Sequence, residues 1–183
     1  MPRKVRTIEM QRLTVEEFHE AEKLPLVVVL DDVRSMHNVG SVLRTADAFR
    51  ISEVVLCGIT GRPPHAEIHK TALGAEDSVS WRYVPSIIDA VKQLKDEDYK
   101  VLAVEQAEGS TLLHQFQPAA DRRYAVILGN EVKGVRQEAI DLCDGCLEIP
   151  QFGTKHSLNV SVTAGIIIYH FAQPLLLKAP ANL

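Results

Sequence analysis

Apolar and polar residues follow one another along this chain in blocks that predict strands alternating with helices. Residues 24–32 (LPLVVVLDD) form a continuous apolar run rich in β-branched residues, which is typical of a strand buried on both faces. In the next block, 38–50, apolar residues recur at helical spacing: Val39, Val42, Leu43, Ala46 and Phe49. These two blocks predict the first strand and helix of an α/β domain.

The alternation continues to the end of the sequence. Further strands are predicted at 53–58, 99–106, 124–131 and 146–150. Helices are predicted after Thr14 and at 86–98, 135–143 and 158–173. The fold class is therefore α/β, with a mostly parallel sheet flanked by helices, and ligands of such sheets bind at the carboxyl ends of the strands.

Capping and breaking residues set the expected ends of several elements. Thr14 with Glu17 forms a capping box, and Ser86 precedes a helix with Asp89 at its third position. The proline pair in 62–77 predicts a loop there, and Pro174 is expected to stop the last helix.

Composition limits the class of protein without identifying it. The 183 residues carry 46% apolar residues and a net charge of −4, which suits one folded domain. No apolar run reaches the roughly 18 residues of a membrane span, and no secretory signal is visible, so we expect a cytoplasmic protein with no membrane partner. The first twelve residues form a local basic arm, which is either a solvated tail or a contact for RNA; its cations are Arg3, Lys4, Arg6 and Arg12.

The sequence lacks several familiar site motifs. It contains no P-loop and no dinucleotide glycine fingerprint after the first strand. Cys143 and Cys146 form a single C-x-x-C pair, which we interpret as structural because a zinc site needs a second pair. His65 and His69 are interpreted as surface histidines on a loop, and no metal is predicted.

Polar residues at the ends of the predicted strands are the candidates for chemistry. Asn38 is either the N-cap of its helix or a ligand-binding residue, and Arg44 is either a surface residue or a guanidinium held for a phosphate or sugar hydroxyl. Gly129 follows a buried strand, where a glycine lets a ligand approach the backbone closely. Glu131 is either a site residue or a first-turn helix acid.

The stretch SLNVSVTAG (157–165) places polar residues at the start of an otherwise apolar helix. Ser157 accounts for a helix cap, but Asn159 is a poor helix former in the expected first turn. A polar cluster that binds a ligand at the helix N-terminus explains both residues.

Three of these stretches, in this order, resemble the motifs of the SpoU, or TrmH-like, branch of the SPOUT RNA methyltransferases. They are HNVGSVLRTADAF (37–49), LGNEVKGV (128–135) and IPQFGTKHSLNVSVTAGIIIYH (149–170). The resemblance covers roughly residues 24–172. It implies an α/β fold whose C-terminal part forms a deep trefoil knot, a homodimer, and S-adenosylmethionine as cofactor. The implied reaction is methyl transfer to a ribose 2′-hydroxyl of tRNA or rRNA.

The resemblance also implies roles for individual residues. The catalytic set is Arg44, Asn38, Glu131, Ser157 and Asn159. The cofactor contacts are Glu105, Leu128, Gly129, Asn130, Ile149 and Leu158. Arginine is a poor base because its side chain stays protonated far above neutral pH, so we expect Arg44 to orient the hydroxyl and stabilise the developing alkoxide.

The expected organisation is a basic arm with a short helix at 1–23, a methyltransferase domain at 24–174 and a tail at 175–183. The short segment before the first strand favours tRNA over rRNA. The alternatives are a non-catalytic RNA-binding module, an rRNA-specific enzyme of the same chemistry, methylation of a base nitrogen, and a Rossmann-like oxidoreductase. The missing glycine fingerprint argues against the last of these.

Overall fold

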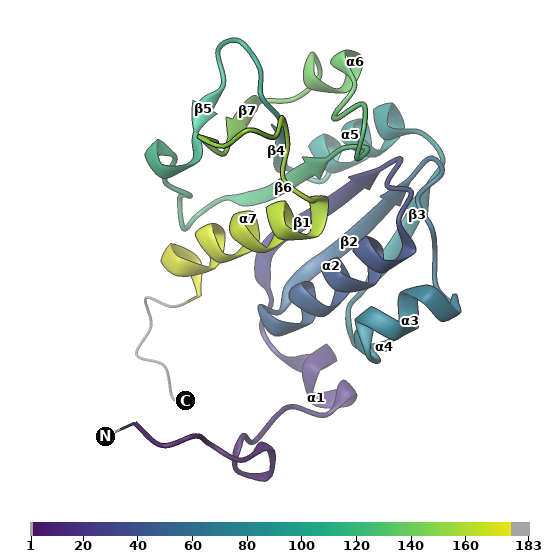
Figure 1. The fold of residues 1–183 in the computed structure, drawn as a ribbon, viewed down its shortest axis with the longest axis vertical. Coiled ribbons are helices and arrows are strands. Elements are labelled where there is room, and N and C mark those ends of the chain that lie inside the picture. The colour runs from purple at the N-terminus through teal and green to yellow at the C-terminus, as the bar shows by residue number, and fades with distance from the viewer. Residues whose placement is uncertain (1, 177–183) are drawn as a thin grey trace.

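The computed structural model describes residues 2–176 and contains one sheet with helices on both of its faces (Figure 1). The strands are β1 (Leu24–Asp31), β2 (Ile51–Cys57), β3 (Trp81–Val84), β4 (Tyr99–Val104), β5 (Thr111–Leu112), β6 (Arg123–Leu128) and β7 (Gly145–Glu148). The α-helices are α1 (Val15–Glu20), α2 (Met36–Ala48), α3 (Ala66–Ala72), α4 (Ala75–Ser78), α5 (Ile87–Asp96), α6 (Gln137–Ile140) and α7 (Val160–Leu175). Two short 3-10 helices are η1 (Thr7–Glu9) and η2 (Leu113–Gln115).

The sheet has the strand order β3-β2-β1-β6-β4-β7-β5, and each neighbouring pair is parallel. The predicted α/β class with a mostly parallel sheet is therefore confirmed. Leu30 of β1 stands opposite both Leu56 of β2 and Leu128 of β6. Because the central strands end at matching levels, the loops that follow them gather at one edge of the sheet.

Strand β1 shows why its sequence is apolar throughout. Leu26, Val28 and Leu30 belong to a core formed with α2, α3 and α7, whereas Val27 and Val29 belong to a second core formed with α5 and α6. All five side chains are fully buried. A strand covered by helices on both faces has no solvent side that needs polar residues.

Several predicted helix ends are corrected by the structure. The N-cap of α2 is Ser35, whose Oγ accepts from the backbone N–H of Asn38, so Asn38 lies in the first helical turn. The N-cap of α7 is Asn159 and not Ser157. Pro174 lies inside α7 and does not stop it, because Leu176 still donates its N–H to the carbonyl of Ala172. The capping residues predicted for α1 and α5, Thr14 and Ser86, are confirmed.

The interpretation of 62–77 as a loop is wrong. After a cis Pro63–Pro64 bond the chain forms α3 and α4, which bury Ile68, Ala72 and Ala75 against the core. Two short strands, β3 and β5, were not predicted, since neither carries a long apolar run. Helix α6 is also shorter than the predicted 135–143.

The last part of the chain returns across the sheet. β7 lies beyond β4, and α7 then packs against α2 and β1 (Figure 1). A trefoil knot in this part stays a prediction of the resemblance. Most of the predicted tail, from residue 177 on, lies outside the described residues. Among residues 2–176, no helix is long and apolar enough to cross a membrane.

Candidate active site

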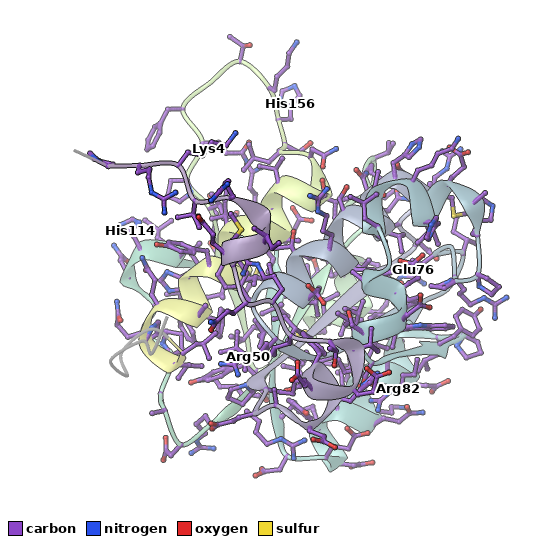
Figure 2. The ribbon with its side chains drawn as sticks, turned by 90° about the horizontal axis from the view of Figure 1, so that it is seen from below. Lys4, Arg50, Glu76, Arg82, His114 and His156 are labelled. Atoms are coloured by element: carbon purple, nitrogen blue, oxygen red, sulfur yellow. The ribbon has the colours of Figure 1, made fainter. Side chains whose placement is uncertain are left out.

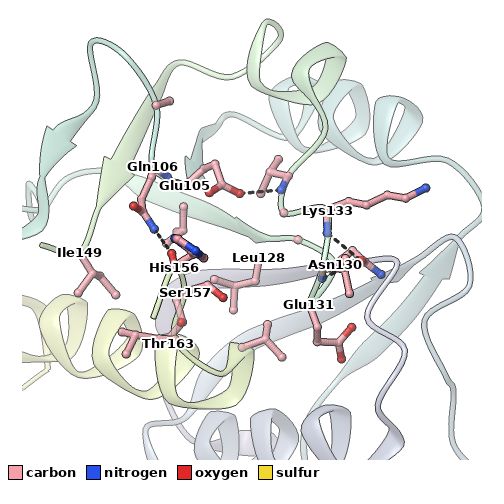
Figure 3. Close-up of a pocket in the computed structure, with 18 of the residues that line it drawn as sticks. Glu105, Gln106, Leu128, Asn130, Glu131, Lys133, Ile149, His156, Ser157 and Thr163 are labelled. Carbon is pink, nitrogen blue, oxygen red and sulfur yellow. Dashed lines mark hydrogen bonds between the residues drawn. The ribbon is translucent and has the colours of Figure 1, made fainter. Parts of the chain in front are cut away.

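A cavity of about 790 Å³ opens where the loops after β4, β6 and β7 meet the start of α7 (Figure 3). A volume of this size is typical of a small-molecule site. Its wall includes all six predicted cofactor contacts: Glu105, Leu128, Gly129, Asn130, Ile149 and Leu158. Glu131 and Ser157 from the predicted catalytic set also line it.

The loop after β6 forms one wall of the cavity as a tight turn. Asn130 and Gly134 exchange two backbone hydrogen bonds, of 3.2 and 2.9 Å, and Oδ1 of Asn130 accepts from the N–H groups of Val132 and Lys133. A Cβ atom on Gly129 would lie 2.2 Å from the backbone of Gly134. The turn itself therefore requires glycine at 129, a reason additional to the expected approach of a ligand.

Glu131 reaches out of this loop to the N-terminus of another helix. Its carboxylate accepts hydrogen bonds from the backbone N–H of Arg34 and of Ser35, both 3.0 Å, and from Nδ2 of Asn38 at 3.2 Å. Glu131 is therefore not a first-turn acid of the helix that follows it, since α6 starts only at Gln137. Partial burial raises the pKa of Glu131, but the hydrogen bonds outweigh this effect and the net pKa lies below the ordinary value.

Asn159 completes a chain of hydrogen bonds across the three motifs. Its Nδ2 donates to Oδ1 of Asn38 at 3.1 Å, while its Oδ1 caps α7 by accepting from the backbone N–H of Ser161 at 2.8 Å. Asn38 thus accepts from Asn159 and donates to Glu131. The structure brings together three of the five predicted catalytic residues, of which Glu131 lines the cavity, as Ser157 does, whereas Asn38 and Asn159 do not.

Arg44 does not join this group. It is exposed on α2, it does not line the cavity, and residues 2–176 offer its side chain no hydrogen bond or ion pair. It follows Asn38 by six positions, and at about 100° per residue the two side chains leave the helix in different directions. A single chain therefore leaves Arg44 apart from the other candidates.

Glu105 lines the cavity, but its carboxylate is used within the protein. One oxygen accepts from the N–H of Val135 at 2.9 Å and the other from the N–H of Gln106 at 2.9 Å. The side chain of Gln106 in turn donates to the carbonyl of His156 (Figure 3). Glu105 therefore connects the loop after β4 to the loop after β6.

Sequence reasoning missed other residues of this wall. Lys133, His156 and Thr163 also line the cavity. All three lie within the motifs at 128–135 and 149–170, and Thr163 lies one helical turn after Asn159, so contiguity and helical spacing were the available signals. Asp31 and Asp32 end the first predicted strand, where a site was expected, but nothing in the sequence indicated that Arg136 pairs with them.

The basic arm lies at the other end of the molecule. It precedes the start of β1, whereas the cavity lies beyond the strand ends, and Figure 1 shows the two regions apart. Figure 2, seen from below, looks onto this end and labels Lys4. Arg3 and Arg6 both pair with Glu9, each at 3.3 Å.

The cysteine and histidine pairs have local roles. Cys143 and Cys146 are free thiols; burial, followed by the nearby Asp144, raises the pKa of Cys143 to about 12. His65 and His69 are exposed, as predicted, but only His65 precedes a helix, whereas His69 lies within α3. His65 caps α3 by accepting from the N–H of Glu67, and His69 contacts Glu76. Within residues 2–176 no three metal-binding side chains come together.

The SpoU rRNA Methylase family model matches residues 25–169. The chain is 32% identical over 154 residues to the 23S rRNA (guanosine-2′-O-)-methyltransferase RlmB of Neisseria meningitidis, covering 84% of this chain and 60% of that protein. It is 33% identical over 171 residues to the tRNA (guanosine(18)-2′-O)-methyltransferase of Thermus thermophilus, covering 93% and 86%.

Solved structures share this fold. An AdoMet-bound rRNA methyltransferase from Sinorhizobium meliloti superposes with a TM-score of 0.77 at 26% identity, covering 85% of this chain and 61% of that one. A TrmH/SpoU tRNA-modifying enzyme from A. aeolicus superposes with a TM-score of 0.76 at 23% identity, covering 87% and 81%.

Proposed function

The chain belongs to the SpoU methylase family, and from this premise we propose that it transfers a methyl group from S-adenosylmethionine to a ribose 2′-hydroxyl of RNA. The observation that carries the proposal is the hydrogen-bonded chain Glu131–Asn38–Asn159, which meets the cavity wall at Glu131. The proposal includes a cytoplasmic location, a basic arm with a short helix at 1–23, a methyltransferase domain at 24–174 and a tail at 175–183.

The cavity suits a nucleoside-based cofactor. Leu128, Ile149 and Leu158 provide apolar surface for an adenine ring, and the turn at 129–134 presents backbone groups beside them. S-adenosylmethionine supplies, when bound, a methyl group activated by its sulfonium. In this proposal Glu105, Gly129 and Asn130 complete the cofactor site.

The chain's own residues have to position the ribose. Asn38 is fixed in orientation, because it donates to Glu131 and accepts from Asn159. Ser157 lines the cavity, and its hydroxyl is proposed to hydrogen-bond the sugar. Holding the reacting hydroxyl in line with the methyl group makes the reaction effectively unimolecular, which lowers its activation barrier.

Arg44 is proposed to stabilise the alkoxide that develops on the ribose oxygen. A guanidinium is well suited to this role, whereas its high pKa makes it a poor base. Because Arg44 lies off the cavity wall of its own chain, we propose that a homodimer completes the site.

Helix α7 supports the dimer. Val162, Ile166 and Tyr169 are 51%, 37% and 49% exposed, and a Cβ on Gly165 would meet nothing within 4 Å. These positions form one stripe on the helix. An apolar stripe with a small residue at its centre fits a second copy of the same helix, and α2, which carries Arg44, packs beside it.

For the RNA we propose tRNA before rRNA, since the tRNA enzyme of Thermus thermophilus matches more of this chain than RlmB does. Arg3, Lys4, Arg6 and Arg12 are proposed to contact RNA phosphates. Their distance from the chain's own cavity means that the RNA spans the molecule or that the arm serves the partner subunit's site.

The test is to titrate the purified protein with S-adenosylmethionine by calorimetry and then to supply methyl-labelled cofactor with unmodified tRNA or rRNA. We expect cofactor binding, with label on tRNA. Label on rRNA alone would overturn the tRNA preference and keep the chemistry. Cofactor binding without transfer to either RNA favours the non-catalytic module, and no cofactor binding rejects the proposed function.

A further inference from the structure

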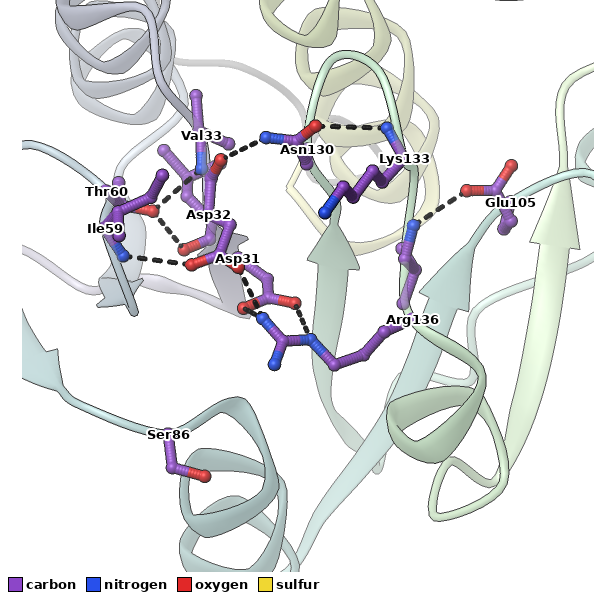
Figure 4. Close-up of polar contacts among 12 residues, drawn as sticks. Asp31, Asp32, Val33, Ile59, Thr60, Ser86, Glu105, Asn130, Lys133 and Arg136 are labelled. Carbon is purple, nitrogen blue, oxygen red and sulfur yellow. Dashed lines mark hydrogen bonds and ion pairs between the residues drawn. The ribbon is translucent and has the colours of Figure 1, made fainter.

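One side chain of the cavity loop faces away from the cavity. Every residue from Leu128 to Gln137 lines the cavity except Arg136. Its guanidinium extends behind the loop to the end of β1, where Nε and Nη2 bind the two carboxylate oxygens of Asp31 at 3.2 and 3.3 Å (Figure 4). Nη2 also pairs with Asp32. Arg136 thus connects the far end of the loop to the strand beside β6.

Asp31, the first carboxylate that pairs with Arg136, is buried and depends on that arginine. Asp31 is 2% exposed, and Arg136 is its side chain's one partner among residues 2–176. Burial raises the pKa of Asp31, and Arg136 opposes that rise. Without Arg136, a carboxylate would be left buried with no counter-charge.

Asp32 adopts a left-handed backbone conformation, with a φ of 53°, that is strained for a residue other than glycine. Besides Arg136, two other residues contact it through side-chain hydrogen bonds: the N–H of Ile59 donates to its Oδ1 at 2.9 Å, and Nδ2 of Asn130 donates to its carbonyl at 2.7 Å. The near end of the cavity loop is therefore tied to the same point as the far end.

We propose that Arg136 is a positioning residue for the cofactor: by binding Asp31 and Asp32 it closes the loop 129–135 into the shape that forms the cavity wall. Asn130 holds the start of the loop, Glu105 holds Val135, and Arg136 closes the end. The inference rests on the proposed function, since the cofactor site is part of it. If the loop spends only a fraction of the time in its binding shape, the apparent affinity falls by that fraction.

The test compares Arg136→Met with Arg82→Met in the full-length protein. Arg82, on the edge strand β3, also bridges two carboxylates, those of Glu53 and Glu97, but lies away from the cavity. Calorimetry with S-adenosylmethionine gives the dissociation constant, and hydrogen exchange reports the amides of 130–135. Arg136→Lys, which keeps a charge opposite Asp31, takes the place of Arg136→Met if the latter does not fold.

We expect Arg136→Met to raise the dissociation constant by about tenfold and to speed exchange at 130–135, with Arg82→Met changing neither. Arg136→Lys should give the same changes in smaller size, because lysine cannot bind a carboxylate through two nitrogens. Equal affinity for wild type and Arg136 variants would overturn the inference, and so would equal losses in the Arg82 and Arg136 variants. Failure of the wild type itself to bind the cofactor would reject the proposed function instead.

Discussion

The side-chain amide of Asn159 donates a hydrogen bond to Oδ1 of Asn38 over 3.1 Å, although 121 positions separate them in the sequence. Asn159 is also the N-cap of α7. Asn159 therefore caps α7 and contacts Asn38 at the same time, whereas the sequence indicated Ser157 as the cap. The link joins the first and third motifs, and Glu131 joins the second motif to Asn38.

The two contacts of Asn159 can be separated by substitution. Asn159→Asp keeps an oxygen that caps α7 but loses the donor to Asn38, whereas Asn159→Ala loses both. We expect the Asp variant to keep its stability and the Ala variant to lose about 1 kcal/mol. Both should reduce methyl transfer by about tenfold or more, measured at saturating cofactor.

Ser86→Ala is the matched control, because it removes the N-cap of α5 away from the cavity. It should cost about as much stability as Asn159→Ala and leave transfer unchanged. Full activity in Asn159→Asp would show that the contact with Asn38 has no functional role.

Glu131 gives the protein a dependence of stability on pH. Its pKa is lower in the folded state than the ordinary value of 4.5, so its ionised form favours folding. This contribution is present above pH 4.5 and is lost as the pH falls through the folded-state pKa. Glu131→Gln should therefore lower the free energy of unfolding by about 1 kcal/mol at pH 7, with a smaller difference at more acid pH.

Denaturant unfolding of both proteins from pH 7 to pH 3.5 measures this difference. A gap that stays constant over that range would mean that the charge of Glu131 does not stabilise the fold.

Arg44 should matter for turnover and not for folding. Its side chain is exposed and makes no hydrogen bond within residues 2–176, so Arg44→Lys should leave the melting temperature unchanged. We expect kcat to fall by about a hundredfold, because lysine replaces the planar donor pair with a single ammonium. Arg122→Lys, another exposed arginine, is the control. Near wild-type turnover in Arg44→Lys would reject the proposed role.

Replacing Gly165 by leucine tests the dimer, because the substitution should stabilise the isolated chain and prevent its association. A leucine there meets open space in one chain, and replacing glycine inside a helix should stabilise the isolated chain by up to about 1 kcal/mol. The same side chain would separate two α7 helices packed face to face. Gly165→Leu should therefore be monomeric and inactive yet stably folded, as measured by sedimentation equilibrium.

Lys92→Leu adds the same side chain to an exposed position of α5, on the other face of the sheet, and should not alter association. A dimeric Gly165→Leu would place the interface elsewhere, and a monomeric wild type would reject the dimer.

The elements that sequence reasoning predicted are those with a strong local pattern. β1 and β6 are long apolar runs, and the ends of α1 and α5 carry side-chain caps. The helices α3 and α4 were missed because the proline pair suggested a loop, although Ile68, Ala72 and Ala75 recur at helical spacing. Short strands such as β3 owe their conformation to pairing with β2, which no local pattern reveals.

In the candidate site too, features with a local sequence pattern were predictable and features that depend on tertiary contacts were not. The cavity lining was predictable because its residues lie in contiguous motifs. The contact of Arg136 with Asp31, and the use of Glu105 to hold Val135, depend on strands that are distant in sequence lying side by side. The choice of Ser35 over Asn38 as the N-cap of α2 also depends on where the helix begins in three dimensions.

The position of the methyl group on the RNA product tests the central claim most directly. Labelled product is digested with alkali, which cleaves RNA only next to a free 2′-hydroxyl. We predict that the label remains in an alkali-resistant dinucleotide, with a 2′-O-methylated nucleoside on its 5′ side. Label released in single nucleotides would place the methyl group on a base and contradict the account.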